Sequence, residues 1–188
     1  MTSSTLQIAI TDKDDIICNG DLSSYANVTL LTGDSASTTY LWSNGATTQN
    51  ISGMAAGTYT VTATSGSCTV TQSITVVDVI LTVNAWIGNP GVQTATMQVN
   101  DVIAINGGVT TNHANPVYSW TESNPAYVDI TDSTAIATDA TANAENGITV
   151  LTFTANAGPC TATGSVEITV ESYLGMPTAF TPNGDGIN

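Results

Sequence analysis

The stretch GTYTVTATSGSCTVTQSITV, residues 57–76, decides the architecture of this chain. Tyr59, Val61 and Ala63 alternate with four threonines, which is the period of a β-strand with one apolar and one hydroxylated face. The small residues at 65–66 allow a turn, and the alternation then resumes. The stretch therefore predicts a β-hairpin. Similar short alternating runs recur along the chain without helical periodicity, which indicates an all-β fold.

This hairpin has a counterpart later in the chain. Residues 62–76, TATSGSCTVTQSITV, align with residues 154–170, TANAGPCTATGSVEITV. A tryptophan on a predicted strand precedes each copy, Trp42 in the first and Trp120 in the second. The chain is therefore expected to contain two copies of one plan. The expected boundaries are 1–78 for the first domain, 79–172 for the divergent second domain and 173–188 for a linker and a truncated further domain.

Each copy resembles an immunoglobulin-like β-sandwich. The segment AAGTYTV, residues 55–61, is similar to the tyrosine corner of that fold, and Val61 stands where antibody domains carry a cysteine. The second copy has Leu151 at the position of Tyr59, so it is expected to diverge more. The fold class expected is all-β, with two tandem immunoglobulin-like β-sandwich domains. The predicted core residues are Trp42, Tyr59, Val61 and Trp120.

The charge balance excludes some classes of partner. The chain of 188 residues has Lys13 as its single cation, no Arg, and a formal net charge of −14. A chain with one cation cannot neutralise phosphates, so nucleic acid is excluded. No apolar run is long enough to cross a membrane, so membrane insertion is not expected. The composition, 41% hydrophobic and 9% charged, supports a folded core and favours an extracellular protein.

The three cysteines predict one disulfide and one free thiol. Cys18 precedes the second strand of the first copy, and Cys68 begins its last strand. These two segments run side by side in an immunoglobulin-like sandwich, so a Cys18–Cys68 bridge is expected, with two buried free thiols as the alternative. Cys160 is then the odd cysteine and is expected to be a buried free thiol.

No catalytic motif is found in the sequence. There is no phosphate-binding loop and no Gly-x-Ser-x-Gly elbow, and His113 lies in a predicted surface loop with no nucleophile placed beside it. The protein is therefore not expected to be an enzyme. No cofactor is expected, although carboxylates in loops are the ligands that Ca²⁺ prefers, and solvated acidic loops are the favoured alternative. The calcium candidates are Asp12, Asp14, Asp15, Asn183 and Asp185.

The end of the chain carries a family resemblance. Residues 177–188, PTAFTPNGDGIN, resemble the first residues of the gliding-motility-associated C-terminal domain of Bacteroidetes, the type B sorting domain of type IX secretion. The family's next residue is an Asp, and the resemblance implies that this residue and the rest of the domain are expected after residue 188. The resemblance implies that a sorting domain follows this segment in the intact protein.

The first copy resembles the repeats of SprB-like gliding-motility adhesins of Bacteroidetes. The matching residues are Cys18, the WSNGATTQ segment at 42–49, Gly57–Tyr59 and Cys68. The resemblance implies a non-catalytic stalk of tandem repeats near the C-terminus of a large adhesin attached to the outer membrane. It implies three kinds of partner: neighbouring repeats, the secretion machinery through the downstream domain, and an external surface or polysaccharide through distal regions. The triplets DSA and DST also resemble the phylum's O-glycosylation sequon, at Ser35 and Ser133.

Two alternative functions stay open at this stage. A carbohydrate-binding module would need two or three exposed, coplanar aromatic side chains, and Trp86 is the candidate to watch. Accessory sandwich domains of a large secreted enzyme would look the same within this segment. The stalk of a surface adhesin is the favoured interpretation.

Overall fold

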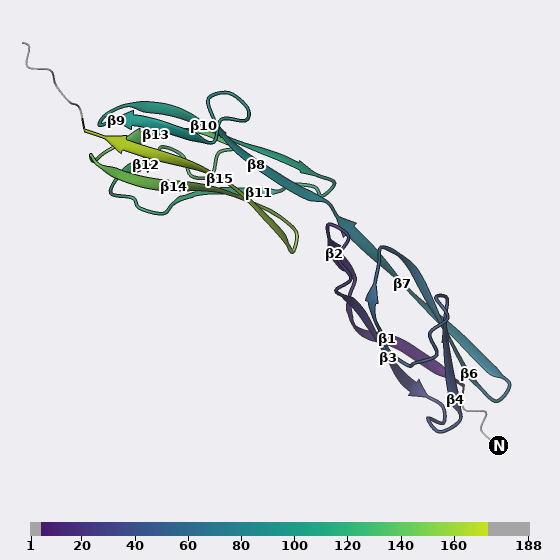
Figure 1. The fold of residues 1–188 in the computed structure, drawn as a ribbon. Coiled ribbons are helices and arrows are strands. Elements are labelled where there is room, and N and C mark those ends of the chain that lie inside the picture. Colours follow the sequence, from purple (N-terminus) through teal and green to yellow (C-terminus); the bar gives the residue numbers. More distant parts are fainter. Residues whose placement is uncertain (1–4, 173–188) are drawn as a thin grey trace, which may run out of the picture. The chain divides into compact units, whose positions relative to one another are not determined.

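A computed structural model describes residues 5–172, and these residues form strands and turns with no helix among them (Figure 1). They divide into two compact units. The first unit contains residues 5–82 together with 109–117 and 155–162, and the second contains 83–108, 118–154 and 163–172. The first unit thus extends beyond the 1–78 domain, because it also includes two short segments from the second half of the chain.

The first seven strands build two sheets of the first unit. One sheet has the order β1-β3-β5, and the other has the order β2-β7-β6-β4. The strands are β1 (Gln7–Asp14), β2 (Ile16–Cys18), β3 (Ser24–Thr32), β4 (Thr38–Trp42), β5 (Ile51–Met54), β6 (Gly57–Ser65) and β7 (Cys68–Val79).

The remaining eight strands build two further four-stranded sheets. Their orders are β12-β13-β10-β8 and β11-β14-β15-β9. The strands are β8 (Leu81–Ile87), β9 (Thr94–Gln98), β10 (Val102–Thr111), β11 (Val117–Glu122), β12 (Val128–Ile130), β13 (Ala137–Ala142), β14 (Gly147–Ala157) and β15 (Cys160–Glu171). The chain therefore folds as two immunoglobulin-like β-sandwiches, each made of two sheets.

The hairpin of residues 57–76 is formed by β6 and β7. Its register pairs Tyr59 with Ile74 and Ser65 with Cys68. Val61 and Ala63 are completely buried, whereas Thr60, Thr62 and Thr64 beside them are partly exposed. The alternation of the sequence thus becomes a sheet with one face on the core and one face toward solvent.

Trp42 lies in the core of the first unit, at the end of β4. Its side chain is 1% exposed, and its indole Nε1 donates a hydrogen bond to the Thr48 carbonyl oxygen at 3.0 Å. Tyr59 is half-buried, and its hydroxyl donates to the carbonyl oxygen of Ala55 at 3.2 Å, four residues upstream. This is the geometry of a tyrosine corner, and it fixes the entry of the chain into β6.

Trp120 occupies the matching place in the second unit. Its side chain is 2% exposed, and its Nε1 donates to the Ala135 carbonyl oxygen at 3.1 Å. Its ring packs against Phe153, with 4.9 Å between the ring centroids. Gly107 faces the same phenylalanine, and a Cβ at this glycine would lie 2.2 Å from the ring, so no larger residue fits. Leu151, at the position of Tyr59, is fully buried.

Each unit also contains a parallel pair of strands. In the first unit, β2 pairs with β7 so that Cys18 lies opposite Val79. In the second unit, β9 pairs with β15, with Thr94 opposite Glu167. A parallel pair places the carboxyl ends of both strands side by side. This direction decides which cysteine Cys18 can reach.

Candidate functional site

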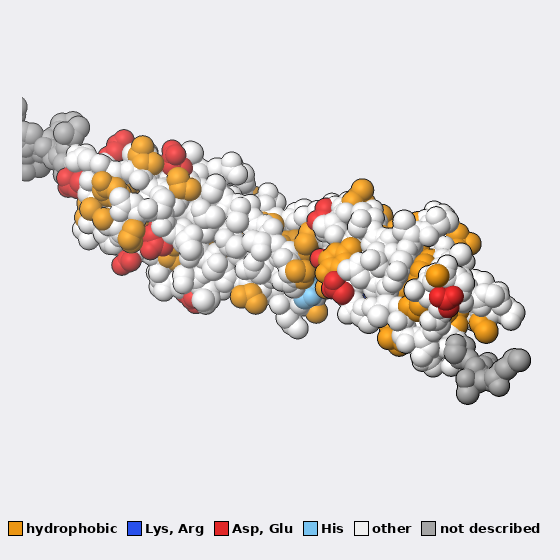
Figure 2. Space-filling view, turned by 90° about the horizontal axis from the view of Figure 1, so that it is seen from below, with side chains coloured by type: hydrophobic (Ala, Val, Ile, Leu, Met, Phe, Trp, Pro, Cys, Tyr) orange, Lys and Arg blue, Asp and Glu red, His pale blue; other side chains and the backbone are white. Residues whose placement is uncertain are grey.

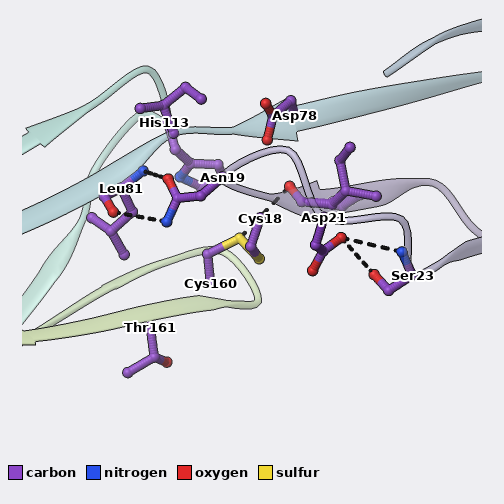
Figure 3. The surroundings of a disulfide bond; sticks show 12 residues. Cys18, Asn19, Asp21, Ser23, Asp78, Leu81, His113, Cys160 and Thr161 are labelled. Carbon is purple, nitrogen blue, oxygen red and sulfur yellow. Dashed lines mark hydrogen bonds between the residues drawn. A yellow bond between two sulfur atoms is a disulfide. The ribbon is translucent and has the colours of Figure 1, made fainter. Parts of the chain in front are cut away.

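The chemically distinctive feature of the first unit is a disulfide between Cys18 and Cys160 (Figure 3). Cys18 is the last residue of β2, and Cys160 is the first residue of β15. Their Cα atoms are 5.7 Å apart, and 142 positions separate them in the sequence. The Cys160 side chain is buried, and its Sγ lies 3.9 Å from the Ile17 carbonyl oxygen. In the chain-entropy model a loop of this length stabilises the folded state by about 5 kcal/mol.

The predicted Cys18–Cys68 bridge is therefore wrong, as is the prediction that Cys160 is the free thiol. Cys68 is the free cysteine of the described residues, and it is exposed. The strands that carry Cys18 and Cys68, β2 and β7, do pair, but they run in parallel. Cys18 therefore lies opposite Val79, at the end of β7. Cys68 stands at the other end of this 12-residue strand, roughly 36 Å away at 3.3 Å a residue. A disulfide needs Cα atoms within about 7 Å of each other.

A tight turn follows Cys18. The amide of Asp21 donates to the Cys18 carbonyl oxygen at 3.1 Å, and the two central residues have positive φ, 51° at Asn19 and 77° at Gly20. Two positive φ values define a type I′ turn, for which Asn-Gly is the preferred pair. The turn points the Gly20 amide at Asp78, whose Oδ1 accepts a hydrogen bond at 2.9 Å.

The side chain of Asn19 holds the start of β8. Its Oδ1 accepts from the amide of Leu81 at 2.8 Å, and its Nδ2 donates to the carbonyl oxygen of Leu81 at 3.0 Å (Figure 3). The backbone amide of Asn19 also donates to the Val79 carbonyl oxygen at 3.1 Å. Asn19 therefore hydrogen-bonds to the last residue of β7 and to the first residue of β8, on both sides of the step between these strands at Ile80, as a neighbouring strand would.

Asn112, which follows β10, makes a second contact of the same kind. Its Oδ1 accepts from the amide of Ile80 at 3.0 Å, and its Nδ2 donates to the Asp78 carbonyl oxygen at 2.9 Å. Ile80 itself belongs to no strand. The two asparagines thus satisfy four backbone groups of residues 78–81 where the strand ladder is interrupted. We call the disulfide, Asn19 and Asn112 together the bridge site.

His113 lies next to the bridge site and is half-buried rather than fully exposed (Figure 3). Its Nδ1 is buried without a hydrogen-bond partner in the described part of the chain. A Cβ at Gly158, in the turn before Cys160, would lie 3.0 Å from the Nε2 of His113. Gly158 also has a φ of 61°, which favours glycine. Both the backbone angle and the close approach of His113 therefore require glycine at this position.

The acidic residues near the N-terminus make hydrogen bonds and an ion pair with neighbouring residues of the chain. Asp12 accepts hydrogen bonds from the Tyr25 hydroxyl at 3.0 Å and from the Asn27 Nδ2 at 2.9 Å. The hydrogen bond to Asp12 and the charge of that carboxylate raise the pKa of Tyr25. Asp14 accepts from the amide of Ile16, and Asp15 pairs with Lys13.

These carboxylates do not come together as a metal site. Within residues 5–172, no group of three or more His, Cys, Asp or Glu side chains is placed to hold a metal ion. The other two calcium candidates, Asn183 and Asp185, lie outside the described residues. The prediction that the chain needs no cofactor stays a prediction.

The two sequon serines, Ser35 and Ser133, both lie in exposed turns. Each follows an aspartate whose side chain caps the turn: Asp34 accepts from the Ala36 amide at 3.0 Å. Asp132 accepts from the amide of Thr134 at 2.9 Å and from its hydroxyl at 2.7 Å. The hydrogen bonds from Thr134 lower the pKa of Asp132.

The face shown in Figure 2 is mostly uncharged, with scattered acidic side chains and several small groups of apolar ones. Each aromatic side chain within residues 5–172 is at least half-buried. Trp86 packs over Gly108, where a Cβ would lie 2.7 Å from the indole ring.

An open depression of about 480 Å³ in the second unit is lined by Tyr127, residues 146–148 and residues 169–171. In the part of the chain described, no helix is long and apolar enough to cross a membrane.

Comparison with known proteins finds likeness in fold alone. No protein-family model matches the chain, and no curated protein matches its sequence. Among solved structures, extracellular domains 3–5 of Drosophila OTK superpose with a TM-score of 0.54 at 9% identity, over 89% of this chain and 62% of that one. The chain thus spans less than two thirds of that structure.

Two further solved structures show weaker likeness. The fibronectin(III)-like modules of Clostridium thermocellum CbhA match with a TM-score of 0.41 at 12% identity, over 88% of this chain and 95% of that one. Three N-terminal domains of the outer capsid protein Hoc of bacteriophage RB49 match with a TM-score of 0.38 at 17% identity, over 89% and 58% of the two chains.

Proposed function

We propose that this chain is a non-catalytic stalk segment of a large adhesin on the outer surface of a bacterial cell. The observation that carries the proposal is the bridge site. One disulfide there closes a loop across 142 sequence positions, and two asparagine side chains hold the step between β7 and β8. Such a site joins distant parts of the chain through one covalent bond and four side-chain hydrogen bonds, as a segment that carries load requires.

The same bond supports a location outside the cytosol. Disulfides persist in oxidising compartments outside the cytosol. The likeness to OTK, whose matched domains are described as extracellular, supports the same placement. The net charge of −14 with a single lysine is also suited to a soluble surface exposed to water.

The finer assignment rests on sequence resemblance. The segment at 42–49 and Gly57–Tyr59 are similar to repeats of SprB-like gliding-motility adhesins, and residues 177–188 resemble the start of a type B sorting domain. In this proposal a domain after residue 188 engages type IX secretion. Residues 1–172 hold the distal regions of the adhesin away from the cell. Those distal regions bind an external surface or polysaccharide.

A replacement experiment tests the proposal. In the source cell, residues 1–172 of the full-length protein are exchanged for an unrelated tandem of two β-sandwiches of similar size. A spacer is defined by its length and folding, so surface display and attachment of the cells should be retained. Deletion of the segment without replacement should weaken attachment. If only the native sequence restores attachment, the segment itself binds a ligand and the proposal is wrong.

The carbohydrate-binding alternative has a separate test. The purified segment is applied to a glycan array, together with a Trp86→Ala variant, because Trp86 is the aromatic residue nearest to a sugar platform. The stalk proposal predicts no binding at micromolar concentration for either protein. Binding by the native segment that the substitution abolishes would replace the stalk with a carbohydrate-binding module.

A further inference from the structure

The positions of the two bridged cysteines define a short covalent path along the chain. Cys18 ends the second strand from the N-terminus, and Cys160 begins the last strand of the described residues. A path from β1 to the end of β15 can therefore pass through the disulfide and omit residues 19–159. Most of both sandwiches lies in this omitted part.

We propose that the Cys18–Cys160 bond is a force bypass: tension between the two ends of the chain runs through β1, β2, the disulfide and β15, and residues 19–159 cannot be pulled out. This inference rests on the proposed stalk function, because a stalk is a chain that carries load between its ends.

The loaded segments have little length to release. Residues on the path lie almost entirely in β1, β2 and β15, and strands already rise about 3.3 Å a residue. A fully extended chain spans at most about 3.6 Å a residue. Even if these strands peel from their partners, residues 5–18 and 160–172 can reach only about 95 Å, bridge included.

Without the bond the same chain is far more extensible. Residues 5–172 in a continuous extended chain would reach about 600 Å. The difference, about 500 Å, is the length hidden behind the 142-position loop. A Cys18–Cys68 bridge would have shielded only residues 19–67 and left the second sandwich in the load path. The partner chosen in the structure shields both.

Single-molecule force spectroscopy tests the bypass directly. Residues 1–188 are pulled between two marker domains without reductant, and a second protein carries Cys18→Ser and Cys160→Ser. The native protein should release no step longer than about 100 Å. The double variant should release about 500 Å more in total, whether its sandwiches unfold in steps or are already unfolded. Cys68→Ser is the matched control and should behave as the native protein. Release of the full length by native, disulfide-bonded protein would overturn the proposal.

A cut inside the loop gives a test that does not depend on folding of a variant. A protease site is inserted in the exposed turn at 88–91, between β8 and β9. After cleavage the native protein should still hold tension between its ends, because both fragments remain joined through Cys18–Cys160. The tether should part when reductant breaks the bond by thiol–disulfide exchange. A tether that parts on cleavage alone would show that the bond does not carry the load.

The two proposals can fail separately. The pulling and cleavage results depend only on the isolated chain, whereas the replacement experiment depends on the cell. If the bypass holds and replacement fails, the stalk function is wrong and the mechanical property stands. If replacement works and the native protein extends fully, the stalk stands and the bypass is wrong.

Discussion

Replacing Asn19 by alanine should destabilise the first unit. The change removes two hydrogen bonds to Leu81, of 2.8 and 3.0 Å, and Leu81 is only 2% exposed. Each bond contributes about 1 kcal/mol, and a buried backbone group left without a partner adds to the loss. Alanine at a φ of 51° costs about a further 1 kcal/mol. The expected total is about 3 kcal/mol.

Two variants separate these terms. Asn115→Ala changes an asparagine of similar φ, 54°, whose side chain makes none of these bonds, so it should cost about 1 kcal/mol. Asn19→Gly relieves the backbone but still removes the bonds, so it should cost about 2 kcal/mol. Urea unfolding followed by tryptophan fluorescence gives the free energies, and hydrogen exchange at the Leu81 amide reports the local loss. If Asn19→Ala and Asn115→Ala differ by less than about 0.5 kcal/mol, the contact with Leu81 does not hold the step between β7 and β8.

Three further predictions concern the cysteines, a surface aspartate and export. Cys160→Ser should lower the free energy of unfolding by up to about 5 kcal/mol because the closed loop is lost, whereas Cys68→Ser should leave it unchanged, as urea unfolding without reductant will show. Because Thr134 lowers the pKa of Asp132, ionised Asp132 stabilises the fold above its unfolded pKa, and this contribution is lost as the pH falls through the folded pKa. The Tm difference between native protein and Asp132→Ala should therefore shrink below about pH 4, and a constant difference would mean that the charge contributes nothing. Fused to a reporter with a signal peptide in a type IX-competent cell, residues 1–188 should leave the reporter in the periplasm, and a type B sorting domain added after residue 188 should bring it to the surface; surface delivery by residues 1–188 alone would show that the signal lies within them.

The sequence was sufficient for the features that depend on local periodicity. Tyr59, Val61 and Ala63 alternate with threonines, and this pattern determines which face of β6 is buried. The immunoglobulin-like fold follows from such runs and from one tryptophan in each copy. Trp42 and Trp120 lie at matching places, each donating to a carbonyl in a later turn.

The bridge site could not be predicted from the alternation of apolar and polar residues. Alternation specifies the face of a strand but not how far along it a neighbour lies, so the adjacency of β2 and β7 could be inferred while the partner of Cys18 could not. Asn19 contacts a residue 62 positions away in the sequence, and Asn112 contacts residues at least 32 positions away. One signal was present: Asn-Gly after Cys18 is a preferred type I′ pair, which indicates a tight turn there.

The identity of the disulfide tests the bridge site and the force bypass most directly. The native protein is alkylated without reductant, digested with pepsin at low pH and analysed by mass spectrometry. We expect a peptide pair joined through Cys18 and Cys160, and a single alkyl label on exposed Cys68. A peptide pair joined through Cys18 and Cys68, with Cys160 carrying the label only after unfolding, would contradict both the bridge site and the force bypass.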